Sequence, residues 1–180
     1  MRKILISAAA VAALCTPALA QAQVVPPVAP TQAFDSAVAE GCVAIAADRL
    51  TLTAPSETLA RASLIAWQPS VVEQAAFSDF SAEGRAFARR PSTVGTVVVG
   101  HDTVRDVCRV AVVGATERDV QAIRSYIEAL VRTLTRAGSN AWTGSIDASP
   151  RLRLVLQNGV AQGGPAGAPQ LTLTFTREPS

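Results

Sequence analysis

The chain has 180 residues, with sixteen Lys or Arg against fourteen Asp or Glu, for a formal net charge of +2. Arg2 and Lys3 lie in a segment that we expect to be removed, which leaves fourteen basic residues against fourteen acidic ones. A nucleic-acid-binding surface needs a concentrated excess of positive charge, so this class of protein is disfavoured. The length fits one domain with a sizeable core.

Residues 1–20 have the pattern of a secretory signal peptide. Arg2 and Lys3 precede an apolar run from Ile4 to Leu14, and small residues lead to an expected cleavage after Ala20. The run is too short to cross a bilayer, so we expect no transmembrane segment. Lipid attachment at Cys15 is the alternative, but a lipoprotein box has a small residue where this chain has Leu14. We therefore expect a periplasmic or secreted protein without lipid.

Two cysteines, Cys42 and Cys108, remain after the signal. Because the compartment beyond the inner membrane is oxidising, we expect them to form a disulfide. Two free buried thiols are the alternative, since Cys can act as a small apolar residue. A bridge would close a loop of about 66 residues and stabilise the fold by about 4 kcal/mol in the chain-entropy model.

The N-terminal half is expected to hold helices. Residues 21–32 are proline-rich and read as a disordered lead-in, which leaves a single domain over 33–178. Helical spacing predicts a first helix over 32–48 with Cys42 on its inward side. Ser56 is expected to cap a short second helix.

Residues 69–91 are ambiguous in pattern. They favour short helical turns over 71–77 and 82–88, and the aromatic residues of this region and just before it are expected to be buried, namely Trp67, Phe77, Phe80 and Phe87.

The C-terminal half predicts strands around one long helix. Residues 93–100 and 104–113 form an expected hairpin with His101 to Thr103 as its turn, and Cys108 faces inward by alternation. Thr116 and Asp119 resemble a capping box, and apolar spacing predicts a helix that runs to Ala137 and stops at Gly138. A heptad seam with a partner chain is the alternative to core packing of this helix.

Strict alternation predicts two further strands, 151–157 and 170–176, joined by a glycine-rich loop. The expected fold is α+β: a two-layer domain whose antiparallel sheet has at least four strands in two hairpins flanking the long helix, with the N-terminal helices packed on the sheet.

Missing residue types exclude several chemistries. The chain has no lysine after Lys3 and a single histidine, His101. Schiff-base lysines, P-loops and multi-histidine zinc sites are therefore excluded. With both cysteines expected in a disulfide and no calcium loop present, we expect neither a metal nor a cofactor.

One catalytic set remains possible by residue type. His101 and Asp102 could join a serine brought from elsewhere in a nucleophilic triad. Neighbouring residues on an extended chain point to opposite sides, however, so Asp102 is poorly placed to orient His101. An exposed turn histidine is the favoured interpretation.

An anion could be bound by an arginine patch formed by Arg89, Arg90, Arg105 and Arg109, because guanidinium groups bind carboxylate and phosphate bidentately. Neutralisation by neighbouring carboxylates such as Glu83, Asp102 and Asp106 is the favoured alternative. The backbone of the loop over 159–167 could also present amides to an anion, but this loop has no basic residue and reads as a flexible connection.

The leading functional hypothesis is a non-enzymatic envelope domain that binds or supports another protein through its sheet edge or its solvent face. A small secreted hydrolase using His101 is the alternative. The sequence indicates neither a ligand nor an oligomeric state.

Overall fold

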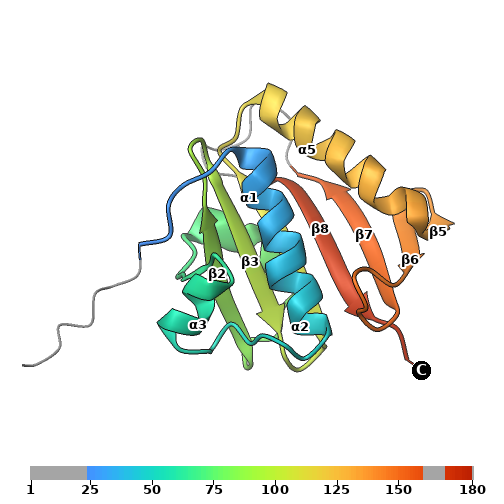
Figure 1. Cartoon of the computed structure of the whole chain (residues 1–180), viewed down its shortest axis with the longest axis horizontal. Helices are drawn as coiled ribbons and strands as arrows, with labels where there is room; N and C mark the ends of the chain where they lie inside the picture. The colour runs from blue at the N-terminus through green and yellow to red at the C-terminus, as the bar shows by residue number, and fades with distance from the viewer. Residues whose placement is uncertain (1–23, 160–168, 180) are drawn as a thin grey trace, which may run out of the picture.

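The computed structural model describes residues 24–159 and 169–179 (Figure 1). The expected signal segment over 1–20, and all but the first residue of the loop over 159–167, lie outside this part of the chain. None of the helices in the described ranges is long and apolar enough to cross a membrane.

The described residues form one antiparallel sheet of eight strands in the order β1-β2-β3-β4-β8-β7-β6-β5. The expected α+β class and antiparallel sheet are therefore confirmed. The strands are β1 (Ile65–Ala66), β2 (Arg85–Pro91), β3 (Thr96–Asp102), β4 (Val107–Val113), β5 (Thr135–Gly138), β6 (Ala141–Gly144), β7 (Leu152–Asn158) and β8 (Pro169–Arg177).

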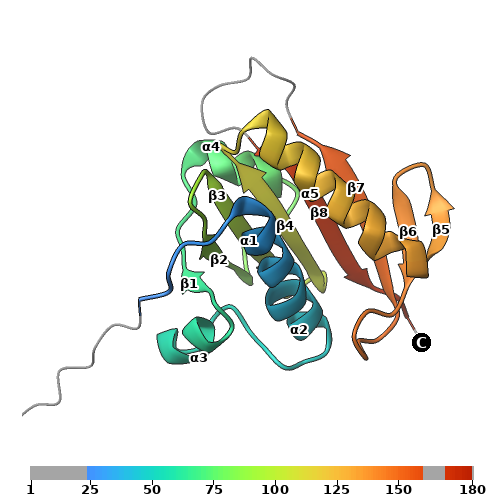
Figure 2. The same cartoon turned by 45° about the horizontal axis from the view of Figure 1, so that its top comes forward.

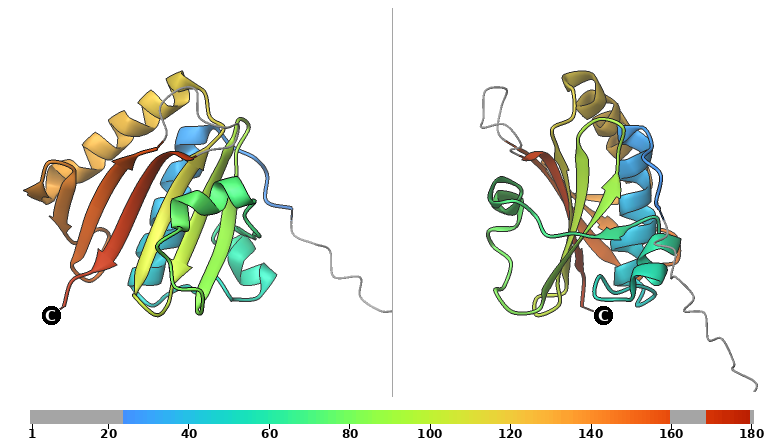
Figure 3. Two further views of the ribbon diagram at one scale, coloured as in Figure 1. Left: turned by 180° about the vertical axis from the view of Figure 1, so that it is seen from behind. Right: turned by 90° about the vertical axis from the view of Figure 1, so that its left-hand side faces the viewer.

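Helices lie on both faces of this sheet (Figures 2 and 3). The N-terminal helical segment and the long α5 cover one face, and the short α4–η2 segment lies on the other, over the β2–β4 half. The expected two-layer arrangement is therefore not confirmed in that form. The helical elements are α1 (Pro30–Ser36), η1 (Ala37–Val43), α2 (Ala44–Ala46), α3 (Ser56–Arg61), α4 (Val71–Gln74), η2 (Ala75–Phe77), α5 (Glu117–Leu130) and η3 (Val131–Thr133).

The first helical segment begins earlier than the sequence suggests. Helix α1 starts at Pro30, a residue type that suits the first helical position because its missing N–H would have no partner there. The preceding chain is attached to the sheet: the Val28 N–H donates to the Pro91 carbonyl, and the Thr93 N–H donates to the Val28 carbonyl. Residues 25–32 of the expected disordered lead-in thus join the domain, with Val25 buried.

Two apolar clusters lie on opposite faces of the β3–β4 hairpin. Cys108, Val110 and Val112 contact the larger core beneath the N-terminal helices and α5. Val98 and Ala111 point the other way, into a smaller cluster with Phe77 and Phe80. These two strands are covered on both faces, which explains their nearly continuous apolar sequence.

Helix α5 begins as expected and ends early. The Thr116 hydroxyl accepts the Asp119 N–H, and the Asp119 carboxylate accepts the Thr116 N–H, which completes the capping box. The helix stops at Leu130 instead of Ala137, and after one 3-10 turn the backbone becomes extended at Leu134. The expected last turn of the helix is instead β5, because pairing with β6 supplies its backbone partners.

The expected helical turn over 82–88 is also wrong, since Arg85–Pro91 forms β2 and pairs with β3 along its whole length. The expected turn over 71–77 is confirmed by α4 and η2. Strands β1, β5 and β6 were not expected, because runs of two to four residues are too short to show a period.

A disulfide joins the N-terminal helical segment to the centre of the sheet. The Cys42 and Cys108 Cα atoms lie 5.4 Å apart, within the range that a bridge requires. Both side chains are buried, Cys42 from η1 and Cys108 from β4. The expected pairing is therefore present.

Replacement of both cysteines by alanine should lower the free energy of unfolding by about 4 kcal/mol, because the unfolded chain loses the constraint of a closed loop. Unfolding should stay cooperative, since helices and hairpins still bury their apolar faces. Thermal and urea unfolding of the Cys42→Ala, Cys108→Ala variant would measure this. Dithiothreitol should lower the midpoint of the parent and not that of the variant. A variant as stable as the parent would contradict a stabilising bridge.

Gly100 is required by the docking of η2 on the sheet. A Cβ atom at Gly100 would lie 2.5 Å from Cε1 of Phe77, whose ring is packed edge-on against Phe80 and Phe87 and cannot move freely. We expect Gly100→Ala to destabilise the fold by about 1–3 kcal/mol through overpacking. Gly41→Ala is the control, because its Cβ would make an ordinary 3.5 Å contact with Val99. Urea unfolding that found both variants equally stable would disprove this packing argument.

Candidate functional site

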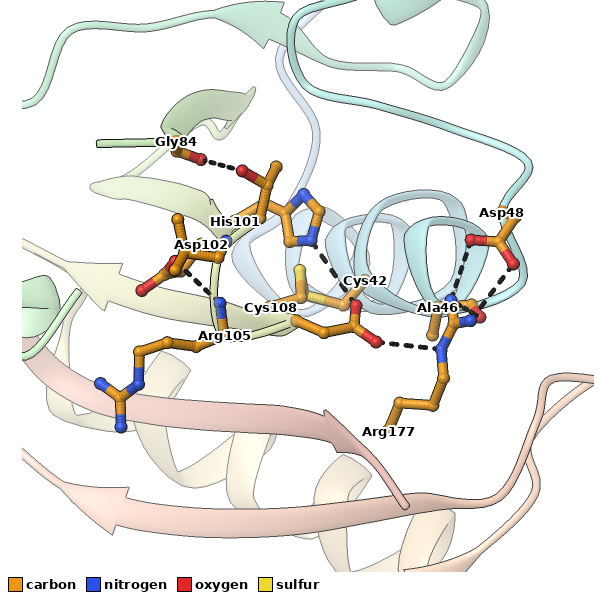
Figure 4. A network of polar contacts seen from close by, with 12 residues as sticks. Cys42, Ala46, Asp48, Gly84, His101, Asp102, Arg105, Cys108 and Arg177 are labelled. Atoms are coloured by element: carbon orange, nitrogen blue, oxygen red, sulfur yellow. Dashed lines mark hydrogen bonds and ion pairs between the residues drawn. A yellow bond between two sulfur atoms is a disulfide. The ribbon is translucent and has the colours of Figure 1, made fainter. Parts of the chain in front are cut away.

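The single histidine is part of the sheet and not an exposed turn residue. His101 lies in β3 with 9% of its surface exposed and faces the disulfide side of the sheet (Figure 4). The turn comes later because Asp102 organises it: Oδ1 of Asp102 accepts the N–H groups of Val104 and Arg105. Oδ2 of Asp102 accepts the Ser81 N–H at 2.7 Å. The side chains of His101 and Asp102 therefore lie on opposite faces of the sheet.

A chain of ionisable side chains runs from His101 along the edge of the main core (Figure 4). Nε2 of His101 lies 4.0 Å from Oδ1 of Asp106, and Oδ2 of Asp106 lies 3.1 Å from Nε of Arg177. Arg177 also donates to Asp48 at 2.9 Å and to the Ala46 carbonyl at 2.7 Å. These contacts fasten the end of β8 to the end of the first helical segment and to the β3–β4 turn.

The cavity beside His101 is small and the imidazole is largely buried. Burial lowers the pKa of His101, against the opposing effect of the Asp106 and Asp102 charges. Nε2 of His101 is buried without a hydrogen-bond partner, beside a pocket of about 10 Å³. Such a volume holds one water molecule. No hydroxyl side chain lines it, so the serine that the His101 alternative requires is not among the residues around this cavity.

The buried histidine should make stability depend on pH. Its pKa lies below the ordinary value of 6.5 in the folded protein, so the unfolded chain binds the proton more readily. This contribution is fully present above about pH 6.5 and is lost as the pH falls toward the folded-state pKa of His101. The His101→Gln variant should show a smaller loss of unfolding free energy between about pH 7 and 5.

Urea unfolding across this pH range would measure the difference. Asp48 and Asp79 also have lowered pKa values, but the stability that they contribute is lost below their ordinary value of 3.8. The window above about pH 5 therefore reports on His101. Parallel losses in the parent and the variant would assign the pH dependence to another group.

On the opposite face of the sheet, Arg109 is fully engaged within the protein. Its guanidinium donates to both carboxylate oxygens of Asp79, at 2.6 and 2.9 Å, and to Oγ1 of Thr174 at 2.8 Å. It also donates to the Ala76 carbonyl and lies 5.0 Å from the ring centre of Phe80. The hydrogen bond from Arg109 is the main cause of the lowered pKa of Asp79. Asp79 was not recognised from the sequence, since it is 30 residues away in an irregular segment.

The four candidate arginines do not form one patch. The guanidinium of Arg89 stacks on the ring of Trp67, with Cζ 4.0 Å from the ring centre, on the same face of the sheet as Arg109. Arg105 donates to the Asp79 carbonyl, so one acidic residue serves two arginines. Arg90 follows Arg89 along a strand and therefore points to the other face, where it donates to the Pro26 carbonyl at 2.8 Å. Asp79 provides the neutralisation that had been expected from Glu83, Asp102 or Asp106.

A groove of about 660 Å³ lies between the η2 segment and strands β7 and β8. It occupies the side of the sheet that α5 does not cover. Among the described helices, η2 reaches β8 there and none lies over β6 or β7 (Figure 3). Its polar lining consists of Ser78, Asp79, Arg109, Gln157, Asn158 and Thr172.

The described residues contain no group of three or more His, Cys, Asp or Glu side chains placed to hold a metal. No family model, no curated protein and no solved structure matches the chain.

Proposed function

We propose that the protein is an exported, non-enzymatic domain that binds another envelope protein through the groove on the open face of its sheet. Export is supported by the signal pattern of residues 1–20 and by a disulfide at the centre of the core, a feature of proteins from oxidising compartments. The observation that carries the binding proposal is the groove of about 660 Å³ beside η2, on the half of this sheet face that α4 and η2 do not cover.

The face is a better binding surface than either edge of the sheet. Edge strand β1 has two residues, and edge strand β5 has four with a register shift. The Arg136 guanidinium donates to the carbonyls of Gly138 and Ser139, so acceptors at the β5 edge are already occupied. Short, irregular and covered edges are what proteins use to prevent strand addition. The partner is therefore expected at the face.

The groove offers hydrogen bonds without a strong net charge. Asp79 and Arg109 neutralise each other, and the exposed side chains of Gln157 and Asn158 add donors and acceptors at the rim. Amide and hydroxyl groups of this kind suit the backbone of an extended polypeptide. A polar binding surface is more typical of a transient complex than of a permanent one, whose interface is more apolar.

Photo-crosslinking in the intact cell envelope would test this proposal. A photoreactive residue at Gln157, at the groove, should give a reproducible crosslinked protein that mass spectrometry identifies. The same residue at Gln121, an exposed position on α5, is the matched control and should not give that product.

A charge placed in the groove should then weaken the complex. We expect Asn158→Asp to reduce crosslinking from position 157, because a second carboxylate would lie beside Asp79 without a cation to match it. The identified partner, when purified, should bind the parent more tightly than this variant. Equal crosslinking from both positions, or no protein product from position 157, would contradict the proposal.

A further inference from the structure

A second groove, of about 290 Å³, lies beside β2 between the N-terminal segment and the end of α3. Both of these elements approach the same edge of the sheet (Figures 1 and 2). Its polar lining consists of Arg61, Ser63 and Arg90, and its apolar wall includes Val25, Pro26 and Ala60. Every ionisable side chain that lines it is therefore cationic.

Arg90 is a buried cation whose hydrogen bonds are incomplete. Only 5% of its surface is exposed, and one of its terminal nitrogens donates to the Pro26 carbonyl at 2.8 Å. Its Nε is buried and has no partner. None of the ion pairs among residues 24–159 and 169–179 involves Arg90. Burying a charge is costly unless it is paired, so the absence of a carboxylate here needs an explanation.

Arg109, another buried arginine, has a hydrogen-bond partner at each of its guanidinium nitrogens. Its side chain is also about nine-tenths buried, and it has a bidentate carboxylate in Asp79, a threonine hydroxyl and a backbone carbonyl. Arg90 has a single backbone carbonyl. Arg90 therefore lacks the carboxylate partner that Arg109 has in Asp79.

We propose that this groove binds a carboxylate carried on a small apolar group, with Arg90 as its principal ligand. A carboxylate matches the planar fork of a guanidinium and would supply the anionic partner that Arg90 lacks. Arg61, exposed at the mouth of the groove, adds a second positive charge, and the Ser63 hydroxyl adds a donor.

The apolar wall selects a carboxylate over a phosphate. Phosphate sites gather several N–H donors, often from consecutive backbone amides. Here one wall is made by Val25 and Pro26, and Pro26 has no N–H to donate. An aliphatic group next to the carboxylate would lie against these residues and against Ala60. The C-terminal residue of a peptide and a small free acid share this chemistry.

This site lies on the helix side of β2, while the polypeptide-binding groove of the proposed function lies on the other face of the sheet. The carboxylate proposal does not depend on that function, and either can fail alone.

NMR titration of the purified protein would test the carboxylate site. The probe is N-acetylvaline, added to about 10 mM, above the millimolar Kd expected from a charge-assisted contact. The Nε–H resonance of Arg90, assigned by its loss in Arg90→Gln, should shift and saturate. N-acetylvalinamide, which lacks the charge, should produce no shift.

Two variants and one control distinguish binding at this groove from nonspecific attraction of the anion to the protein's positive charges. Arg90→Gln should abolish binding. Arg61→Gln, at an exposed position, should weaken it about tenfold, as for the loss of one charged contact, and remains informative if Arg90→Gln does not fold. Arg118→Gln removes an exposed arginine from α5 and should leave the Kd unchanged.

Other outcomes would overturn the proposal: no shift with N-acetylvaline, an equal shift with the amide, or tighter binding of inorganic phosphate than of N-acetylvaline. A longer probe distinguishes the source. Tighter binding of acetyl-Ala-Ala-Val than of N-acetylvaline supports a peptide C-terminus, and equal binding supports a small free acid.

Discussion

The pairing of β4 with β8 is the interaction on which the rest of this structure depends, because it joins the two halves of the sheet. It runs from Val107 opposite Thr176 to the end of β4. On one face β4 presents Cys108, which is covalently tied to the first helical segment. On the other face it presents Arg109, which fixes the chain around Asp79. A shift of one residue in this register would exchange the two faces and disrupt both attachments.

Two networks of ionisable side chains have different structural roles. The chain from His101 through Asp106 to Arg177 closes the edge of the main core, where a cavity admits only a water molecule. The Asp79–Arg109 pair instead borders the open groove, and Asp79 remains about half exposed. The first arrangement is structural, since it fastens the end of β8 to the first helical segment and to the β3–β4 turn. The second holds the floor of a surface that another molecule can reach.

Prediction from the sequence succeeded where a local period was long enough to read. The alternation around β4 and β8 placed their inward residues correctly, and the spacing of the first helical segment placed Cys42 in the core. It failed for β2, whose arginines hide its alternation, and for β5, whose residues are all exposed. The last predicted turn of α5 was lost to β5 because pairing with β6 outweighs local helical preference there.

The sequence by itself determined the antiparallel α+β class and the start of α5 at its capping box, because alternation and local hydrogen bonds need no distant information. It also predicted the bond between Cys42 and Cys108, with Cys15 assigned to the signal segment, and the structure contains this bond. Only the tertiary structure decided the environments of the charged side chains. Asp79 reaches Arg109 across 30 residues, and Arg90 is buried without any carboxylate. Such contacts depend on how separate elements pack in space, and a linear pattern does not record which charges that packing brings together.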